Sequence, residues 1–237
     1  VWAAMAGALV AGMLAGFVTG FFHTFMGIPA ILSGILTQLG LWSVNLKIMG
    51  KANQAINVDK YKLLVSLRFI KNVPFYKNTI LLVAVIIVVL IAVLYWFFGT
   101  ELGFTIRATG CNPNMSRAQG INTNVAKVLA LVFSNGLVGF AGGLLSQYQG
   151  NFDVNMGRGS IVIGLASVII GEVLGEAIFG KKLNFSGRLA FVAVGSIIYY
   201  IVIQFVLWLG LPTIDMKMFS AMVVAIFLAV PYLRGKA

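Results

Sequence analysis

Long segments without charge are the feature that most limits what this chain can fold into. Residues 1–46 contain no Lys, Arg, Asp or Glu, and Ile80–Phe98 is apolar from end to end. A helix needs about 20 mostly apolar residues to cross a hydrocarbon core roughly 30 Å thick. The chain is 60% hydrophobic and 10% charged, and its apolar runs lack the two-residue alternation of a membrane β-barrel. We therefore predict an all-α, polytopic transmembrane helical bundle, with residues 1–237 forming a single domain.

The apolar runs and the polar loops between them predict six or seven membrane segments. They lie at about 3–22, 29–44, 79–98, 125–147, 160–179, 188–209 and 218–230. The net charge of +11 lies mostly in loops, where Lys and Arg set topology and contact lipid headgroups, so we do not expect a nucleic-acid partner. Counting back from a cytoplasmic basic tail places the basic loop 46–78 outside. Eight basic residues then fall inside and nine outside, so the positive-inside rule does not decide the orientation.

One polar stretch, Arg107–Asn122, is built for contact with another protein rather than with lipid. Asn112 suits the N-cap of a short helix, and Pro113 suits the first helical position. Gly120 fits the left-handed residue that follows a helix, and Ile121 supplies the hydrophobic contact after it. The predicted helix, Pro113–Gln119, is only about 10 Å long at 1.5 Å per residue, so it cannot span a membrane. A capped helix at the membrane surface indicates docking against a partner.

Polar side chains at membrane depth are the candidates for a transport pathway. An ionisable group inside a span costs about 2.5–3.5 kcal/mol by insertion scales, so Glu172 is a functional candidate. The alternative for Glu172 is a structural pair with a nearby Lys or backbone amide. Buried amides and hydroxyls also join helices, for about 0.6 kcal/mol per bond, and this leaves their role open. The candidate pathway residues are Thr37, Gln38, Asn135, Gln147 and Glu172.

Small residues at four-residue spacing predict close helix packing in lipid. The glycines concerned are Gly12, Gly16, Gly20, Gly139 and Gly143. The chain has no phosphate-binding P-loop, no HExxH and no GxSxG motif. Its single cysteine excludes an intramolecular disulfide and offers no metal cluster. We therefore expect no catalytic residues, no metal and no cofactor, and any energy source must come from another chain or from an ion gradient.

The segments GFTIRATGCNPNMSRAQGIN (103–122) and SNGLVGFAGGLLSQYQG (134–150) carry a family resemblance. They resemble the membrane permeases of ATP-binding-cassette (ABC) importers of the branched-chain amino acid/ribose type, which have the type II importer fold. In such permeases this pattern lies in a cytoplasmic loop whose short helix docks on the ATPase subunit. The pattern maps onto Gly103, Arg107, Ala108, Gly110, Asn112, Ala118, Gly120 and Ile121.

The resemblance implies a coupling loop over residues 99–124, to which Pro113, Met115, Arg117 and Gln119 would also contribute. Met115, Ala118 and Gln119 would share one face of the short helix, and Arg117 would point elsewhere, toward partner carboxylates or lipid phosphates. ATP-driven closure would move this helix as a rigid lever and rock the attached spans between outward-open and inward-open states. The resemblance also implies a permease dimer, cytoplasmic ATP-binding subunits, an extracytoplasmic solute-binding protein and a bacterial plasma membrane.

The segment MGIPAILSGILTQLGLWSVNLKIMGKANQ (26–54) resembles an amino-acid-importer-like subgroup of these permeases, often linked to aromatic amino acids. An amino acid is the expected solute, and a sugar or nucleoside is the alternative. Such permeases usually carry one or two further N-terminal helices, which this chain is expected to lack. Two other classes stay open: an ion-coupled secondary transporter using Glu172, and a structural or assembly subunit.

Overall fold

The computed structural model describes residues 1–57, 63–65, 79–157, 160–180 and 184–208, together with residues 218, 222 and 225. Most of the expected segment 218–230 and most of the basic loop 46–78 lie outside the described residues. The chain divides into two compact units. Unit 1 comprises Val1–Ile86 and Trp96–Met156, and unit 2 comprises Ile87–Tyr95 and Gly157–Ala237.

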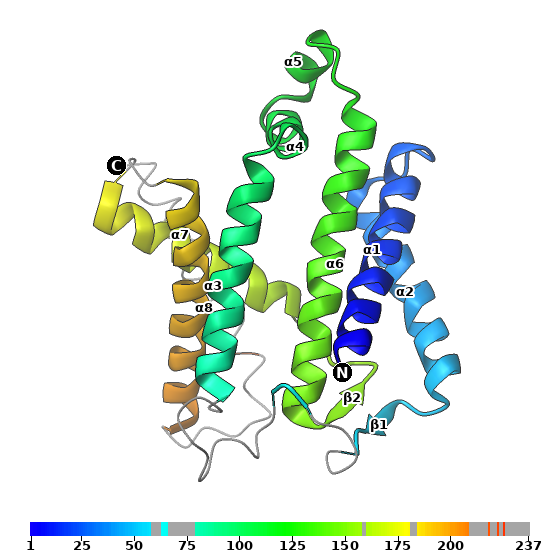
Figure 1. Ribbon diagram of the computed structural model, residues 1–237, viewed down its shortest axis with the longest axis vertical. Helices are drawn as coiled ribbons and strands as arrows, with labels where there is room; N and C mark the ends of the chain where they lie inside the picture. The colour runs from blue at the N-terminus through cyan, green and yellow to red at the C-terminus, as the bar shows by residue number, and fades with distance from the viewer. Residues whose placement is uncertain are drawn as a thin grey trace. The chain divides into compact units, whose positions relative to one another are not determined.

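Helices dominate the described residues. They are α1 (Trp2–Thr24), α2 (Ala30–Met49), α3 (Thr79–Phe98), α4 (Glu101–Cys111), α5 (Pro113–Ala118), α6 (Thr123–Gln149), α7 (Ser160–Phe179) and α8 (Phe185–Trp208) (Figure 1). Within the described residues, α1, α2, α3, α6 and most of α8 are long and apolar enough to cross a membrane. This confirms the polytopic helical class.

The core of unit 1 is the pair α1 and α6, which lie side by side along most of their length (Figure 1). Glycine makes this close approach possible. A Cβ atom on Gly12 or Gly16 would clash with the backbone carbonyl of Asn135 or Leu131 on α6. A Cβ on Gly139 would clash in the same way with the carbonyl of Ala8. Because the hydrophobic effect does not drive helices together in lipid, backbone contact of this kind is what holds them.

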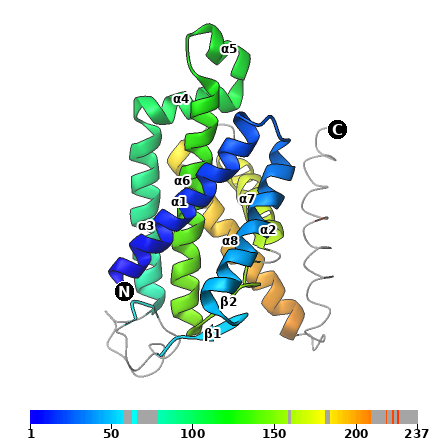
Figure 2. The same ribbon diagram turned by 90° about the vertical axis from the view of Figure 1, so that its right-hand side faces the viewer.

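Helix α2 packs on α1 (Figure 2), and a buried pair of hydroxyls joins the two helices. The Thr19 and Thr37 Oγ1 atoms lie 2.9 Å apart, and the Thr37 hydroxyl also lies 2.9 Å from the carbonyl oxygen of Ser33. Both threonines are 8% exposed. The arrangement satisfies both hydroxyls when Thr37 donates to Ser33 and Thr19 donates to Thr37, so Thr37 joins two helices.

A short antiparallel ribbon joins the far ends of α2 and α6. Strand β1 (Asn53–Ala55) pairs with β2 (Asn151–Asp153), with Gln54 opposite Phe152. The prediction was wrong on two local points: it placed no strand here, and it began the basic loop at residue 46, whereas α2 continues to Met49. The helix ends at Gly50, whose φ of 68° suits glycine. The ribbon lies at the end of unit 1 opposite α5 (Figure 1).

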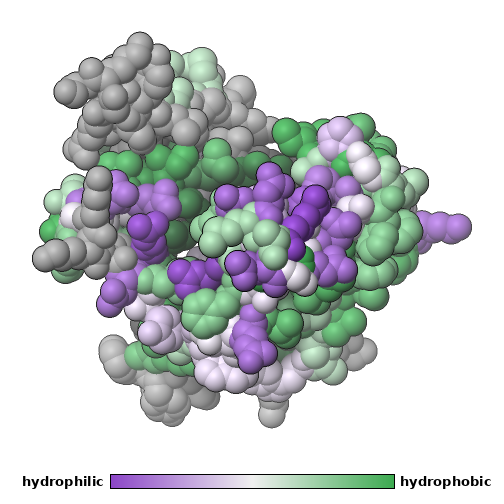
Figure 3. Space-filling view, turned by 90° about the horizontal axis from the view of Figure 1, so that it is seen from above, coloured by the Kyte–Doolittle hydropathy of each residue, from purple (hydrophilic) through white to green (hydrophobic). Residues whose placement is uncertain are grey.

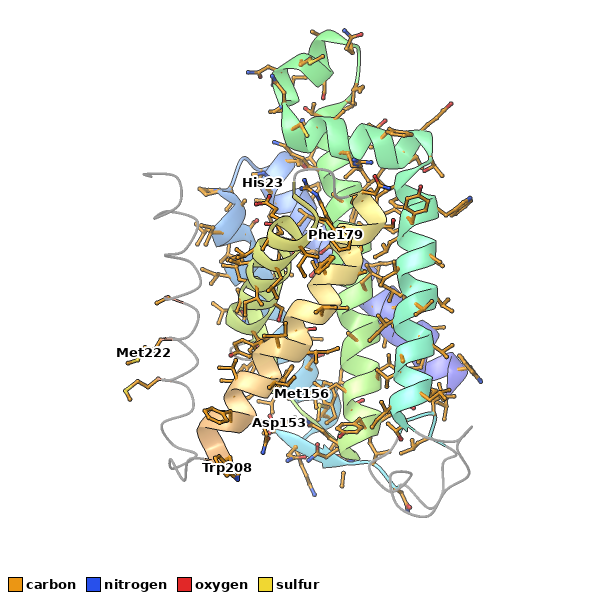
Figure 4. The ribbon with its side chains drawn as sticks, turned by 90° about the vertical axis from the view of Figure 1, so that its left-hand side faces the viewer. His23, Asp153, Met156, Phe179, Trp208 and Met222 are labelled. Carbon is orange, nitrogen blue, oxygen red and sulfur yellow. The ribbon has the colours of Figure 1, made fainter. Side chains whose placement is uncertain are left out.

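In unit 2, α7 and α8 form a closely packed pair. A Cβ on Gly171 would clash with the carbonyl of Phe191, and one on Gly195 would clash with that of Ser167. Beside this crossing lies a small core of Ala166, Ile170, Tyr199 and Ile203. Phe179 and Trp208, at the last turns of the two helices, lie toward opposite ends of the pair (Figure 4).

Candidate functional site

The predicted coupling loop, residues 99–124, is a structured corner of two helices rather than a loop with one. Helix α4 begins directly after α3, and the Thr100 hydroxyl bridges the two. It donates to the carbonyl oxygen of Phe97 at 2.6 Å and accepts from the backbone N–H of Gly103 at 3.3 Å. Sequence reasoning missed α4. The signal was present, because a threonine N-cap followed by a glutamate, Glu101, in the first turn is a helix start.

Gly103 makes the α3–α4 corner sterically possible. A Cβ there would clash with the Phe97 carbonyl and the Phe98 backbone. The start of α4 therefore lies directly against the end of α3, and any larger residue would push the two helices apart.

Helix α5 is capped at both ends, as the sequence indicated, but is one residue shorter than predicted. The Asn112 side-chain oxygen accepts from the backbone N–H groups of Asn114 and Met115, each at 3.1 Å. The helix ends at Ala118 because Gln119 already has a ψ of 11° and serves as the C-cap. Gly120 follows with a φ of 79°, the left-handed conformation that glycine adopts most readily.

The junction of α5 with α6 is fixed by side chains. Arg117 Nε donates to Thr123 Oγ1 at 2.8 Å. Asn122 caps α6 through the backbone N–H groups of Asn124 and Val125, at 3.2 and 3.3 Å. The Nε of Arg117 therefore bonds within its own chain, and the expectation that this residue reaches toward a partner stays a prediction.

The outward surface of this corner is open. In α5 only Ser116 is buried, and Met115 is 64% exposed. Figure 3 looks down on the α5 end and shows hydrophilic side chains gathered there, with hydrophobic residues around them. The predicted coupling residues that lie exposed on this surface are Arg107, Ala108, Gly110, Asn112, Pro113, Met115, Arg117, Ala118, Gln119 and Gly120, whereas Gly103 is buried and Ile121 is partly buried. We call this surface the coupling corner.

Three predicted pathway residues of unit 1 do not line the cavity of that unit described below: Thr37, Gln38 and Asn135. Thr37 is hydrogen-bonded to Thr19 between α1 and α2, and the Asn135 amide donates to the carbonyl of Leu131 on its own helix at 2.9 Å. Gln38 is exposed on α2. Glu172 is exposed on α7 in the other unit.

Gln147 is the exception, because it is buried and lines a cavity of unit 1. Its Oε1 accepts from the backbone N–H of Leu64 at 3.1 Å, and its Nε2 lies 2.9 Å from the sulfur of Met5. The cavity lies toward the ribbon end of α6, and Asp153 marks that end in Figure 4, whereas His23 marks the α4–α5 end.

The described residues contain no cluster of three or more His, Cys, Asp or Glu side chains that could hold a metal ion. Cys111 is a free, exposed thiol at the end of α4.

Comparison with known proteins gives matches along almost the whole chain. A family model described as "Branched-chain amino acid transport system / permease component" matches residues 1–231. Over 222 residues the chain is 38% identical to a tyrosine transport system permease protein of Clostridioides difficile, which covers 94% of this chain and 70% of that protein. It is 30% identical over 224 residues to an uncharacterized protein of Rickettsia prowazekii, covering 94% and 76% of the two chains.

A third relative is a nucleoside ABC transporter permease protein of Lactococcus lactis subsp. cremoris. It is 30% identical over 137 residues, which cover 53% of this chain and 43% of that protein. No solved structure matches the chain.

Proposed function

We propose that this chain, which belongs to the family of permease components of branched-chain amino acid transport systems, forms the transmembrane pathway of an ATP-driven amino acid importer. As a member of that family it is a multi-pass plasma-membrane transport subunit. Its expected partners are cytoplasmic ATP-binding subunits and an extracytoplasmic solute-binding protein. A second permease copy would complete the pathway.

The choice of an amino acid rests on similarity along the chain. The match to the tyrosine permease covers 94% of this chain at 38% identity, whereas the match to the nucleoside permease covers 53% at 30%. An aromatic amino acid such as tyrosine is therefore the first solute to test. A sugar or nucleoside is the second.

The observation that carries the coupling proposal is the set of hydrogen bonds and close backbone contacts that hold the coupling corner, together with its open surface. Thr100 and Gly103 hold α4 against the end of α3, and Arg117 holds α5 against the start of α6. A displacement of α5 by an ATPase subunit would therefore be transmitted to both α3 and α6 with little deformation of the coupling corner. An ATPase subunit that contacts α5 differently in its two states would shift the equilibrium between the outward-open and inward-open permease. The contacts of the coupling corner would carry that shift to α3 and α6.

A charge placed on the exposed end of α5 tests this proposal. We expect Ala118→Asp to release the ATPase subunits from the purified complex and to reduce ATP-driven tyrosine uptake in proteoliposomes by about tenfold or more, the effect of ~1.4 kcal/mol of lost docking energy. The matched control is Ala52→Asp, the same change at an exposed position beyond α2, near the ribbon, where the ATPase should stay bound.

Unchanged ATPase binding and uptake in Ala118→Asp would overturn the coupling assignment. Uptake by the wild type that continues without ATP would favour an ion-coupled carrier, and Glu172→Gln would then be the variant to test.

A further inference from the structure

The cavity beside Gln147 is a groove that runs along α1 in unit 1, with a volume of about 630 Å³. One wall is a stripe of α1 residues from Val1 to Ala15, and the facing wall is the glycine-rich end of α6. The end of α2 and the β1–β2 ribbon close it on the third side. Ala4 and Ala11 in this lining are exposed, so the groove is open to the surroundings of the chain.

The groove is long and thin. The α1 stripe spans about 21 Å at 1.5 Å rise per residue. The volume of about 630 Å³ spread over that length gives a mean cross-section on the order of 30 Å². A helix with its side chains is about 10–12 Å across and needs roughly three times that area. A single extended hydrocarbon chain fits within this cross-section, whereas a helix would have to lie over the groove with one face toward it.

Most of the lining is apolar, and it carries no charged side chain. A zwitterionic amino acid would lose the hydration of two charges here and gain no ionic partner, which costs several kcal/mol. The groove therefore suits an uncharged, apolar ligand. This separates it from any site for the transported solute.

The polar groups of the lining gather toward the ribbon end. Gln147 is 6% exposed, and among the described residues its Nε2 meets the Met5 sulfur alone, a weak acceptor, so one N–H of this amide has no partner in that part of the chain. The Asn45 side chain makes no hydrogen bond within the part of the chain that the structure describes. Both amides offer N–H donors to an ester or phosphate oxygen.

The position of this polar end agrees with the depth of a membrane interface. Helix α6 has 27 residues and is about 40 Å long, which exceeds a hydrocarbon core of roughly 30 Å. Gln147 lies two residues before its end, whereas the Ala15 end of the groove lies near the α1–α6 contact at Leu131, 16 residues and about 24 Å before Gln147 on α6. Polarity therefore falls from interface to interior along the groove, as it does along a glycerolipid.

We propose that this groove holds one acyl chain of a membrane glycerolipid, with the ester region on the amides of Gln147 and Asn45. The lipid would act as a structural part of the α1–α2–α6 packing. The proposal needs only that the chain lies in a membrane, so it stands independently of the solute and of ATPase coupling.

Glycines of known surroundings allow a matched test. Gly142 lines the groove, and a Cβ there meets nothing within 4 Å, so the Cβ of Gly142→Leu has room and we expect the rest of its side chain to occupy the groove. Gly40 on α2 is exposed, lies outside the lining and is equally free of neighbours, so Gly40→Leu is the control. Ala11→Leu, on the opposite wall, is a second blocking variant should the first fail to fold.

The measurement is native mass spectrometry of the full chain purified from bacterial membranes in mild detergent. We expect one retained phospholipid per chain in the wild type and in Gly40→Leu, and at least a tenfold lower retained fraction in Gly142→Leu or Ala11→Leu. Equal retention in blocked and control variants would overturn the proposal. Displacement of the lipid by free tyrosine would overturn it in favour of a solute site, and uptake in proteoliposomes, measured separately, tests the transport function itself.

Discussion

Arg117 and Thr123 are joined by a 2.8 Å hydrogen bond from Nε to Oγ1, which ties α5 to the first residue of α6. Thr123 is 2% exposed, so this bond forms at the buried side of the junction although most of Arg117 is in solvent. The sequence suggested that this arginine reached outward. In the structure it stiffens the connection through which we propose that ATPase movements reach the membrane.

Thr123→Val removes the acceptor for Arg117 and keeps the side-chain volume. We expect the chain to fold and bind the ATPase, but coupled uptake per ATP hydrolysed to fall about fivefold, because the bond contributes about 1 kcal/mol to holding α5 in place. The control is Thr105→Val, whose hydroxyl bonds only the carbonyl of Glu101 on its own helix. Equal uptake per ATP in both variants would remove Arg117 from the coupling path.

Gly110 and Gly120 both belong to the family pattern, yet the structure separates their roles. Gly120 has a φ of 79°, so Gly120→Ala should destabilise the corner by about 1 kcal/mol. Gly110 is helical, exposed and open around its Cβ position, so Gly110→Ala should stabilise α4 by up to ~1 kcal/mol.

Under the coupling proposal, the exposed Gly110 on α4 lies where the ATPase subunit approaches the permease. We expect Gly110→Leu to leave the melting temperature of the isolated permease unchanged or slightly raised while weakening its binding to the ATPase, measured by co-purification. Full ATPase binding by Gly110→Leu would show that the partner does not approach α4 closely.

Gly16→Ala tests the α1–α6 contact. The new methyl group would meet the Leu131 carbonyl and the Val132 backbone, so we expect a loss of about 1–3 kcal/mol of stability. Gly7→Ala on the same helix meets nothing within 4 Å and serves as the control. The readout is thermal unfolding in detergent, and identical melting temperatures would mean that α1 shifts away from α6 at little cost.

Thr37→Val asks whether this residue lines a pathway or only joins helices. Because Thr19 keeps an acceptor in the Ala15 carbonyl, we expect a stability loss of only about 1 kcal/mol. The KM for uptake should not change. A raised KM with unchanged thermal stability would return Thr37 to the pathway.

Local sequence signals predicted the ends of α5 well but did not predict the neighbouring helix α4. Asn112, Pro113 and Gly120 each determine the backbone beside them, so their positions in the chain were enough to predict the capped helix. Helix α4 was missed because its low hydropathy resembles that of a loop, and its Thr100 cap follows an apolar span without a break. The ribbon of β1 and β2 pairs residues about 100 positions apart, which no local pattern reports.

The sequence by itself determined that this chain crosses a membrane as helices and that a capped short helix begins at Pro113, because apolar length and helix caps act locally. Only the tertiary structure decided what the polar and small residues do. In that structure Thr37 is hydrogen-bonded to Thr19, Arg117 is hydrogen-bonded to Thr123, and Gln147 lies beside a narrow apolar groove. Hydrogen-bond partners and cavities depend on which helix faces which, and neighbours of that kind are fixed by packing between segments far apart in the chain.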